Sequence, residues 1–136
     1  MIREARETEV DDVMRVLEGA LLEIEPGKVR QAIARGDALV ASENGHVRGA
    51  LVLEGTHVAA VAVVRRHRAN GIGSALVRRA AERGPLTTEF RPAVRPFYES
   101  LGFAVECEES GAGEESDGMD SEKRCRGRLP AQDSMS

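Results

Sequence analysis

VAVVRRHRANGIG at residues 61–73, continued by SALVRRAAERGP at 74–85, is the most informative stretch of this chain. The small and branched apolar residues at 61–64 favour a β-strand. After the glycine turn, Ile72, Leu76 and Ala80 recur at helical spacing. Gly84-Pro85 then forms a helix stop signal. The stretch therefore predicts a strand, a loop and a helix, in that order.

The predicted start of this helix has the properties of an anion site. A helix begins with unsatisfied backbone N–H groups and a partial positive charge. Gly71 and Gly73 lack the Cβ atoms that would keep an oxyanion away from those amides. The first turn contains no acid, and Arg65, Arg66 and Arg68 add positive charge before it. These features predict a cradle for a phosphate group.

Two plainer interpretations stay open on these residues alone. The arginines can form a solvated surface, which is the usual role of a run of charges. The glycines can serve only as a connection between strand and helix. The spacing matches neither the dinucleotide-binding G-x-G-x-x-G motif nor the P-loop.

The rest of the chain predicts an α+β fold, with one mixed, mostly antiparallel sheet flanked by helices. Asn44-Gly45 between two apolar runs is a strong hairpin signal. The expected order is β-α-α-β-β-β-α-β-α-β-β, with strands at 1–6, 38–41, 47–52, 57–64, 86–90, 103–107 and 123–129, and helices at 10–24, 29–35, 72–83 and 94–101. Pro26-Gly27 is interpreted as an interruption between the first two helices.

Length and composition predict a single domain over residues 1–129 of the 136-residue chain. The net charge of −4 is concentrated at 106–122, where eight acids and no base occur, and we expect this insertion to be disordered. Residues 130–136 are expected to form a flexible tail. The longest apolar run, at 58–64, is too short to cross a bilayer, and the charged N-terminus does not resemble a signal peptide. We therefore expect a cytoplasmic protein.

The two cysteines, Cys107 and Cys125, do not show metal-binding spacing, and no metal site is predicted. In a chain without a signal peptide, free thiols are favoured over a disulfide.

A second informative stretch is RPFYESLGF at 95–103. Phe97, Leu101 and Phe103 are expected to pack in the core. Tyr98 is adjacent to Phe97 and is expected to face elsewhere, into a cleft. A neutral phenol there can donate a proton to a leaving group.

Together the two stretches resemble the acetyl-CoA-binding core of the GCN5-related N-acetyltransferase (GNAT) superfamily, in a small single-domain member of prokaryotic or archaeal type. Arg68, Gly71 and Gly73 are similar to its Q/R-x-x-G-x-G/A signature, and Tyr98 matches its usual general acid. Arg91 stands where many members have Asn, and Arg65 where Pro is common. The resemblance implies acetyl-CoA as acyl donor, bound by Val61, Ala62, Val63, Arg68, Ala69, Asn70, Gly71, Ile72, Gly73 and Ser74.

The implied activity is direct transfer of an acetyl group to a small-molecule amine or to a protein amino group. Glu89, Glu54 and His57 are candidate general bases, although each is better explained as a solvated residue, and a water chain can replace a base. The alternative is a non-catalytic acyl-CoA-binding or regulatory module. The sequence does not favour nucleic-acid binding, since no aromatic residues alternate with the arginines, and a homodimer stays compatible with it.

In this family the region 8–36 lines the acceptor site. Its acids suit a cationic acceptor only weakly, and a solvated helix face explains them better: Asp11, Asp12, Glu18, Glu23 and Glu25.

Overall fold

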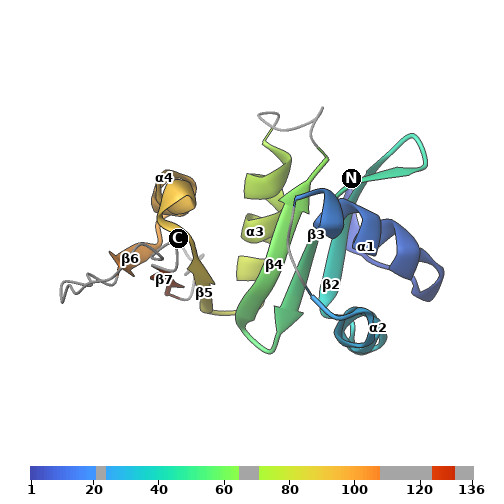
Figure 1. Cartoon of the computed structure of the whole chain (residues 1–136), viewed down its shortest axis with the longest axis horizontal. Helices are drawn as coiled ribbons and strands as arrows, with labels where there is room; N and C mark the ends of the chain where they lie inside the picture. Colours follow the sequence, from blue (N-terminus) through green and yellow to red (C-terminus); the bar gives the residue numbers. More distant parts are fainter. Residues whose placement is uncertain (21–23, 65–70, 108–123, 131–136) are drawn as a thin grey trace, which may run out of the picture.

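A computed structural model describes residues 1–20, 24–64, 71–107 and 124–130. Within these ranges the chain forms one seven-stranded sheet in the order β1-β2-β3-β4-β5-β7-β6 (Figure 1). The strands are β1 (Ile2–Glu4), β2 (Ala38–Glu43), β3 (His46–Glu54), β4 (His57–Val63), β5 (Leu86–Phe90), β6 (Ala104–Cys107) and β7 (Cys125–Leu129). The α-helices are α1 (Val10–Gly19), α2 (Pro26–Arg35), α3 (Ile72–Ala81) and α4 (Arg95–Ser100), and short 3-10 helices cover Glu7–Glu9 and Pro92–Val94.

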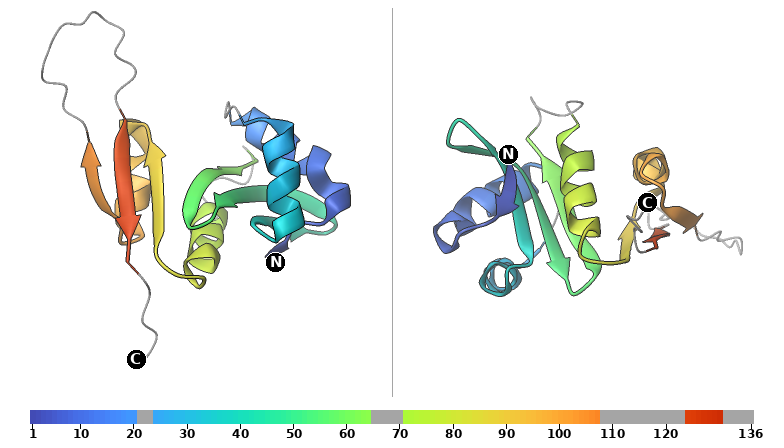
Figure 2. Two further views of the ribbon diagram at one scale, coloured as in Figure 1. Left: turned by 90° about the horizontal axis from the view of Figure 1, so that it is seen from below. Right: turned by 180° about the vertical axis from the view of Figure 1, so that it is seen from behind.

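The sheet is antiparallel except where β4 meets β5. That parallel ladder contains only two residue pairs, His57 with Thr87 and Val58 with Thr88. Strand β4 continues to Val63 and stays paired with β3 as far as Gly49. Strands β4 and β5 therefore separate beyond these two pairs. The sheet divides into an N-terminal half, β1 to β4, and a C-terminal half, β5-β7-β6 (Figure 2).

Helices cover both faces of the N-terminal half (Figure 1). Residues of α3, including Leu76 and Val77, pack with Leu39 and Leu51 on one face. On the other face, α1 and α2 pack on β2, β3 and β4 through a second apolar cluster: Val13, Val16, Leu17, Val29, Ala32, Ile33, Val40, Ala50 and Val52. Successive side chains of a strand point to opposite faces of the sheet. Because helices cover both faces here, these strands are nearly continuous apolar runs.

The C-terminal half is covered on one face. Strands β5 and β7 alternate strictly between buried and exposed residues. Their buried side chains pack with α4 residues such as Tyr98, and the opposite face carries exposed residues such as Glu89, Arg126 and Arg128. Within the described ranges, no helix buries that second face.

The predicted fold class and order of elements are confirmed. The interpretation of Pro26 was wrong, because α2 begins at this residue rather than at Val29. Proline suits the first helical position, since its fixed φ is already helical and its missing N–H needs no partner there. The expected long first helix instead ends at Gly19.

Glu106 and Cys107, which overlap the predicted acidic insertion, belong to β6, in agreement with the strand predicted at 103–107. Residues 108–122 of that insertion and 131–136 of the expected tail lie outside the described residues. No helix in the described parts of the chain combines the length and the hydrophobicity needed to span a membrane.

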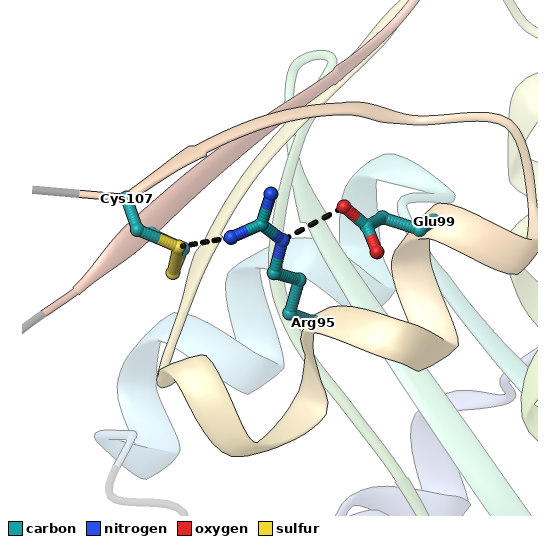
Figure 3. Close-up of a disulfide and its surroundings, with 4 residues drawn as sticks. Arg95, Glu99 and Cys107 are labelled. Atoms are coloured by element: carbon teal, nitrogen blue, oxygen red, sulfur yellow. Dashed lines mark hydrogen bonds and ion pairs between the residues drawn. A yellow bond between two sulfur atoms is a disulfide. The ribbon is translucent and has the colours of Figure 1, made fainter.

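The prediction of free thiols was wrong, because Cys107 and Cys125 form a disulfide. The two residues are direct partners in the antiparallel ladder of β6 and β7, which places their side chains on the same face. Arg95 of α4 donates through one guanidinium nitrogen to Cys107 Sγ at 3.7 Å and through Nε to Glu99 Oε2 at 2.7 Å (Figure 3). The disulfide thus connects the two strands beside α4.

Candidate active site

The N-terminus of α3 is built around Gly71, which caps the helix in a left-handed conformation with φ of 80°. A Cβ atom at Gly71 would meet no other heavy atom within 4 Å, so the space beside this residue is open. The first α-helical hydrogen bond runs from the Ala75 N–H to the Gly71 carbonyl at 3.0 Å. The preceding amides of Ile72, Gly73 and Ser74 therefore have no acceptor within the helix. The first turn contains no acid that could occupy them.

A cavity of about 980 Å³ begins at this helix end and continues between β4 and β5. Its walls come from most of β4, the start of α3, the end of β5, and α4 with the residues before it. The lining residues include Val61, Ala62, Val63, Gly71, Ile72, Gly73, Ser74 and Tyr98 from the predicted site. The other predicted site residues, Arg68, Ala69 and Asn70, lie outside the described residues, as do Arg65 and Arg66.

The cavity exists because β4 and β5 separate after two residue pairs. On their β3 side, Ala60 and Val61 of β4 stay paired with Val52 and Leu51 of β3. On their β5 side, no described strand pairs with this part of β4. This edge of β4 is therefore a template on which an extended amide chain can add by backbone hydrogen bonds.

Tyr98 lies in the wall of this cavity and is nearly buried, with 5% of its surface exposed. Its ring stacks on Phe90 at a centroid distance of 4.4 Å and meets Phe97 and Phe103 edge-on at 4.9 and 5.2 Å. Burial raises the pKa of the Tyr98 phenol, and a hydrogen bond with Thr88 partly opposes this shift. The phenol is therefore protonated near neutral pH and held in one position by three aromatic rings.

Phe97 packs against the apolar core as expected, and it also faces the cavity. It is half-buried and lines the cavity next to Tyr98. A Cβ atom at Gly73 would lie 3.5 Å from two ring carbons of Phe97 and 3.6 Å from Val63 Cγ2. Gly73 thus keeps the gap between α3, β4 and α4 open. The core prediction also holds for Phe103, which is 4% exposed.

The structure distinguishes the three candidate bases. Glu89 lines the cavity, and its Oε2 lies 4.0 Å from Arg126 Nε. Glu54 instead pairs with Lys28 at 3.8 Å, and His57 Nδ1 lies 2.9 Å from Thr87 Oγ1. Neither Glu54 nor His57 contributes to the cavity wall.

The N-terminal region contributes Ala20 and Ile24 to the cavity rather than its acids. Asp11, Asp12, Glu18 and Glu25 do not line it, and Glu23 lies outside the described residues. The interpretation of these acids as a solvated helix face is therefore favoured over a role in holding a cationic acceptor.

Sequence reasoning missed Arg124, which lines the cavity together with Arg91. Arg124 directly precedes Cys125, the residue paired with Phe90 of β5. This pairing between distant segments was the missing signal, since the residues around Arg124 show no recognisable motif.

A family model described as the acetyltransferase (GNAT) domain matches residues 34–105, which is more than half of the chain. The chain belongs to the GNAT acetyltransferase family. The match extends from the end of α2 into β6 and so includes β4, α3, β5 and α4, the elements that form the cavity. No curated protein matches the chain.

Solved structures of GNAT proteins share the fold. Ard1 from Thermoplasma volcanium superposes with a TM-score of 0.77 at 20% identity and covers 97% of each chain. Naa20 from Chaetomium thermophilum, in complex with a bisubstrate analogue, gives 0.74 at 19% identity over 96% of this chain and 86% of its own. Diaminobutyrate acetyltransferase EctA from Paenibacillus lautus, in complex with its substrate and coenzyme A, gives 0.70 at 12% identity over 100% and 98%. At these identities the similarity establishes the fold.

Proposed function

We propose that this GNAT protein is an N-acetyltransferase that moves an acetyl group from acetyl-CoA directly to an amine. The observation that carries the proposal is the single cavity that joins the N-terminus of α3 to the buried Tyr98 phenol through the opening between β4 and β5. Anion binding and proton donation are thus available within one continuous space. The solved EctA structure contains coenzyme A, which supports a ligand of this class.

The donor site fits acetyl-CoA in two chemical respects. The amides of Ile72, Gly73 and Ser74 would hold the pyrophosphate, since they lack helical partners and no acid competes in this turn. The edge of β4 at residues 61–63 would hydrogen-bond to the amides of the pantetheine arm.

In the proposed reaction, the amine nitrogen attacks the thioester carbonyl carbon, so that a C–N bond forms and the C–S bond breaks. Tyr98 would donate its proton to the departing thiolate, and its raised pKa keeps that proton available at neutral pH. The amine loses one proton to a base or to water. Glu89 is the candidate base that lines the cavity. Holding both reactants in one cavity supplies much of the rate advantage.

Replacing Tyr98 by Phe tests this proposal with little disturbance, because the ring can keep its stacking on Phe90. We expect the wild type to bind acetyl-CoA in a calorimetric titration and to acetylate members of an amine panel. The variant should bind acetyl-CoA with similar affinity but turn over about 100-fold more slowly, as expected for loss of a general acid.

Two results would argue against the enzyme. Absence of acetyl-CoA binding by the wild type would contradict the donor site. Binding without transfer to any amine, together with identical behaviour of the Tyr98→Phe variant, would instead support the alternative, a non-catalytic acyl-CoA-binding module.

A further inference from the structure

Arg91 and Arg124 flank the last residue pair of the β5–β7 ladder, at one end of the C-terminal half-sheet. The ladder of β5 and β7 ends with Phe90 opposite Cys125. Arg91 directly follows Phe90 and keeps an extended backbone, with φ of −81° and ψ of 151°. Arg124 directly precedes Cys125, and both arginines are exposed and line the cavity.

Strand alternation places these arginines on the face opposite Tyr98. Phe90 and Cys125 are buried on the α4 side, where Tyr98 stacks on Phe90. The neighbouring residues of extended strands face the other way. This is the side of the sheet on which α1 and α2 pack, and Ala20 and Ile24 from that side also line the cavity. The cavity thus reaches a basic mouth on the face away from α3 and α4.

Neither guanidinium has an acidic partner among the described residues. The nearby acid in the cavity wall, Glu89, lies 4.0 Å from Arg126. Like charges on neighbouring strands repel each other. An anion placed between Arg91 and Arg124 would remove this repulsion, and the planar guanidinium fork matches a carboxylate in particular.

We infer that the amine acceptor carries a carboxylate, which Arg91 and Arg124 hold at this mouth while the amine extends into the cavity. This inference rests on the proposed N-acetyltransferase function and specifies its substrate class. The donor is assigned to the α3 side by the anion-binding helix start, so the basic mouth on the other face is left for the acceptor. The carboxylate can belong to a free amino acid or to an acidic side chain near a protein N-terminus.

Pairs of acceptors of similar shape, one with and one without this carboxylate, test the inference. One pair is alanine and alaninamide. The other is two C-terminally amidated peptides that begin Met-Asp or Met-Asn. Acetyl transfer is measured for each compound, and calorimetric binding of each to the protein saturated with coenzyme A is measured independently of turnover.

We expect the carboxylate member of at least one pair to bind and react at least about tenfold better, as expected for a charge-assisted hydrogen bond. Arg91→Gln and Arg124→Gln should each remove most of that preference. Arg128→Gln is the matched control, because Arg128 is exposed on the same strand face but does not line the cavity. A preference within the amino-acid pair alone assigns a small metabolite, and one within the peptide pair alone assigns an acidic N-terminus.

Equal binding within both pairs would overturn the inference, even if neutral amines are acetylated and the proposed function stands. If no compound is acetylated, the calorimetric binding measurement still tests the inference. Finally, if both arginine variants lose stability without ligand and no pair shows a preference, the arginines serve acids of this chain, and the inference is wrong.

Discussion

The two halves of the sheet differ in how their faces are covered. The first four strands lie between α3 on one face and α1 with α2 on the other, so apolar clusters fill both sides. The last three strands have α4 on one face and exposed, mostly charged residues on the other. A ladder of two residue pairs joins the halves.

The two halves of the sheet therefore make different contributions to the proposed site. The doubly covered half fixes β4 and the start of α3, which carry the proposed donor site. The singly covered half presents one strand face to solvent at the cavity mouth, where a second reactant can enter. This half lacks a second layer of helices among the described residues, and a disulfide links two of its strands, β6 and β7.

Truncating one buried leucine in each half is expected to give the largest effect. Leu17 of α1 is 0% exposed, and Leu129 of β7, in the half that is covered on one face, is 5% exposed. Leu17→Ala should lower the free energy of unfolding by about 4 kcal/mol and Leu129→Ala by about 2 kcal/mol, because a site open to solvent on one face relaxes more easily. Urea unfolding measures both. Equal losses would contradict the distinction between the halves.

Reduction of the Cys107–Cys125 disulfide should have the next largest effect on stability. The bond closes a loop with a sequence separation of 18, and releasing it should cost about 3 kcal/mol of stability through the entropy of the unfolded chain. Thermal unfolding with and without dithiothreitol measures the loss. A Cys107→Ala/Cys125→Ala variant should not respond to the reductant. A wild type whose unfolding is equally indifferent would show that the bond does not support this half.

The ion pair of Arg3 and Glu9 lies in the doubly covered half and should contribute less to the free energy of unfolding. Two hydrogen bonds of 2.9 Å from Arg3 lower the pKa of the Glu9 carboxyl from 4.5 to about 2, helped by the Arg6 N–H. Because this pKa is lower in the folded state, the stabilisation is complete above about pH 4.5 and is lost as the pH falls towards 2.

Glu9→Gln should therefore lose about 2 kcal/mol at pH 7 and approach the wild type at pH 3. Urea unfolding at both pH values measures the difference. A gap between the two proteins that stays constant from pH 7 to pH 3 would contradict the assignment to this ion pair.

Much of the site could be predicted because its signals are local. An Asn-Gly-Ile-Gly turn before a helical pattern indicates Gly71 at the helix start, and the structure places it there. Tyr98 was expected in a cleft away from the core; it lies in the cavity wall but is also a buried member of the apolar core. The order of strands and helices likewise follows from periodicity and turn residues within short windows.

The features that escaped prediction depend on the pairing of distant strands. Cys107 and Cys125 show their relation only once β6 and β7 are in register. Arg91 and Arg124 line one cavity for the same reason, since they flank the last pair of the ladder of β5 and β7. The cavity itself depends on where β4 leaves β5, and no residue pattern within either strand fixes that point.

The anion site at the start of α3 is tested most directly by comparing Ser74→Asp with Ser74→Asn in a calorimetric titration with acetyl-CoA. Ser74 lies in the first turn of α3 and lines the cavity. A carboxylate there should stabilise the helix by about 0.5 kcal/mol through its dipole while repelling a bound pyrophosphate. We expect Ser74→Asp to be at least as stable as Ser74→Asn but to bind acetyl-CoA at least about tenfold more weakly. Equal affinity of the two variants would contradict an anion site at the start of α3.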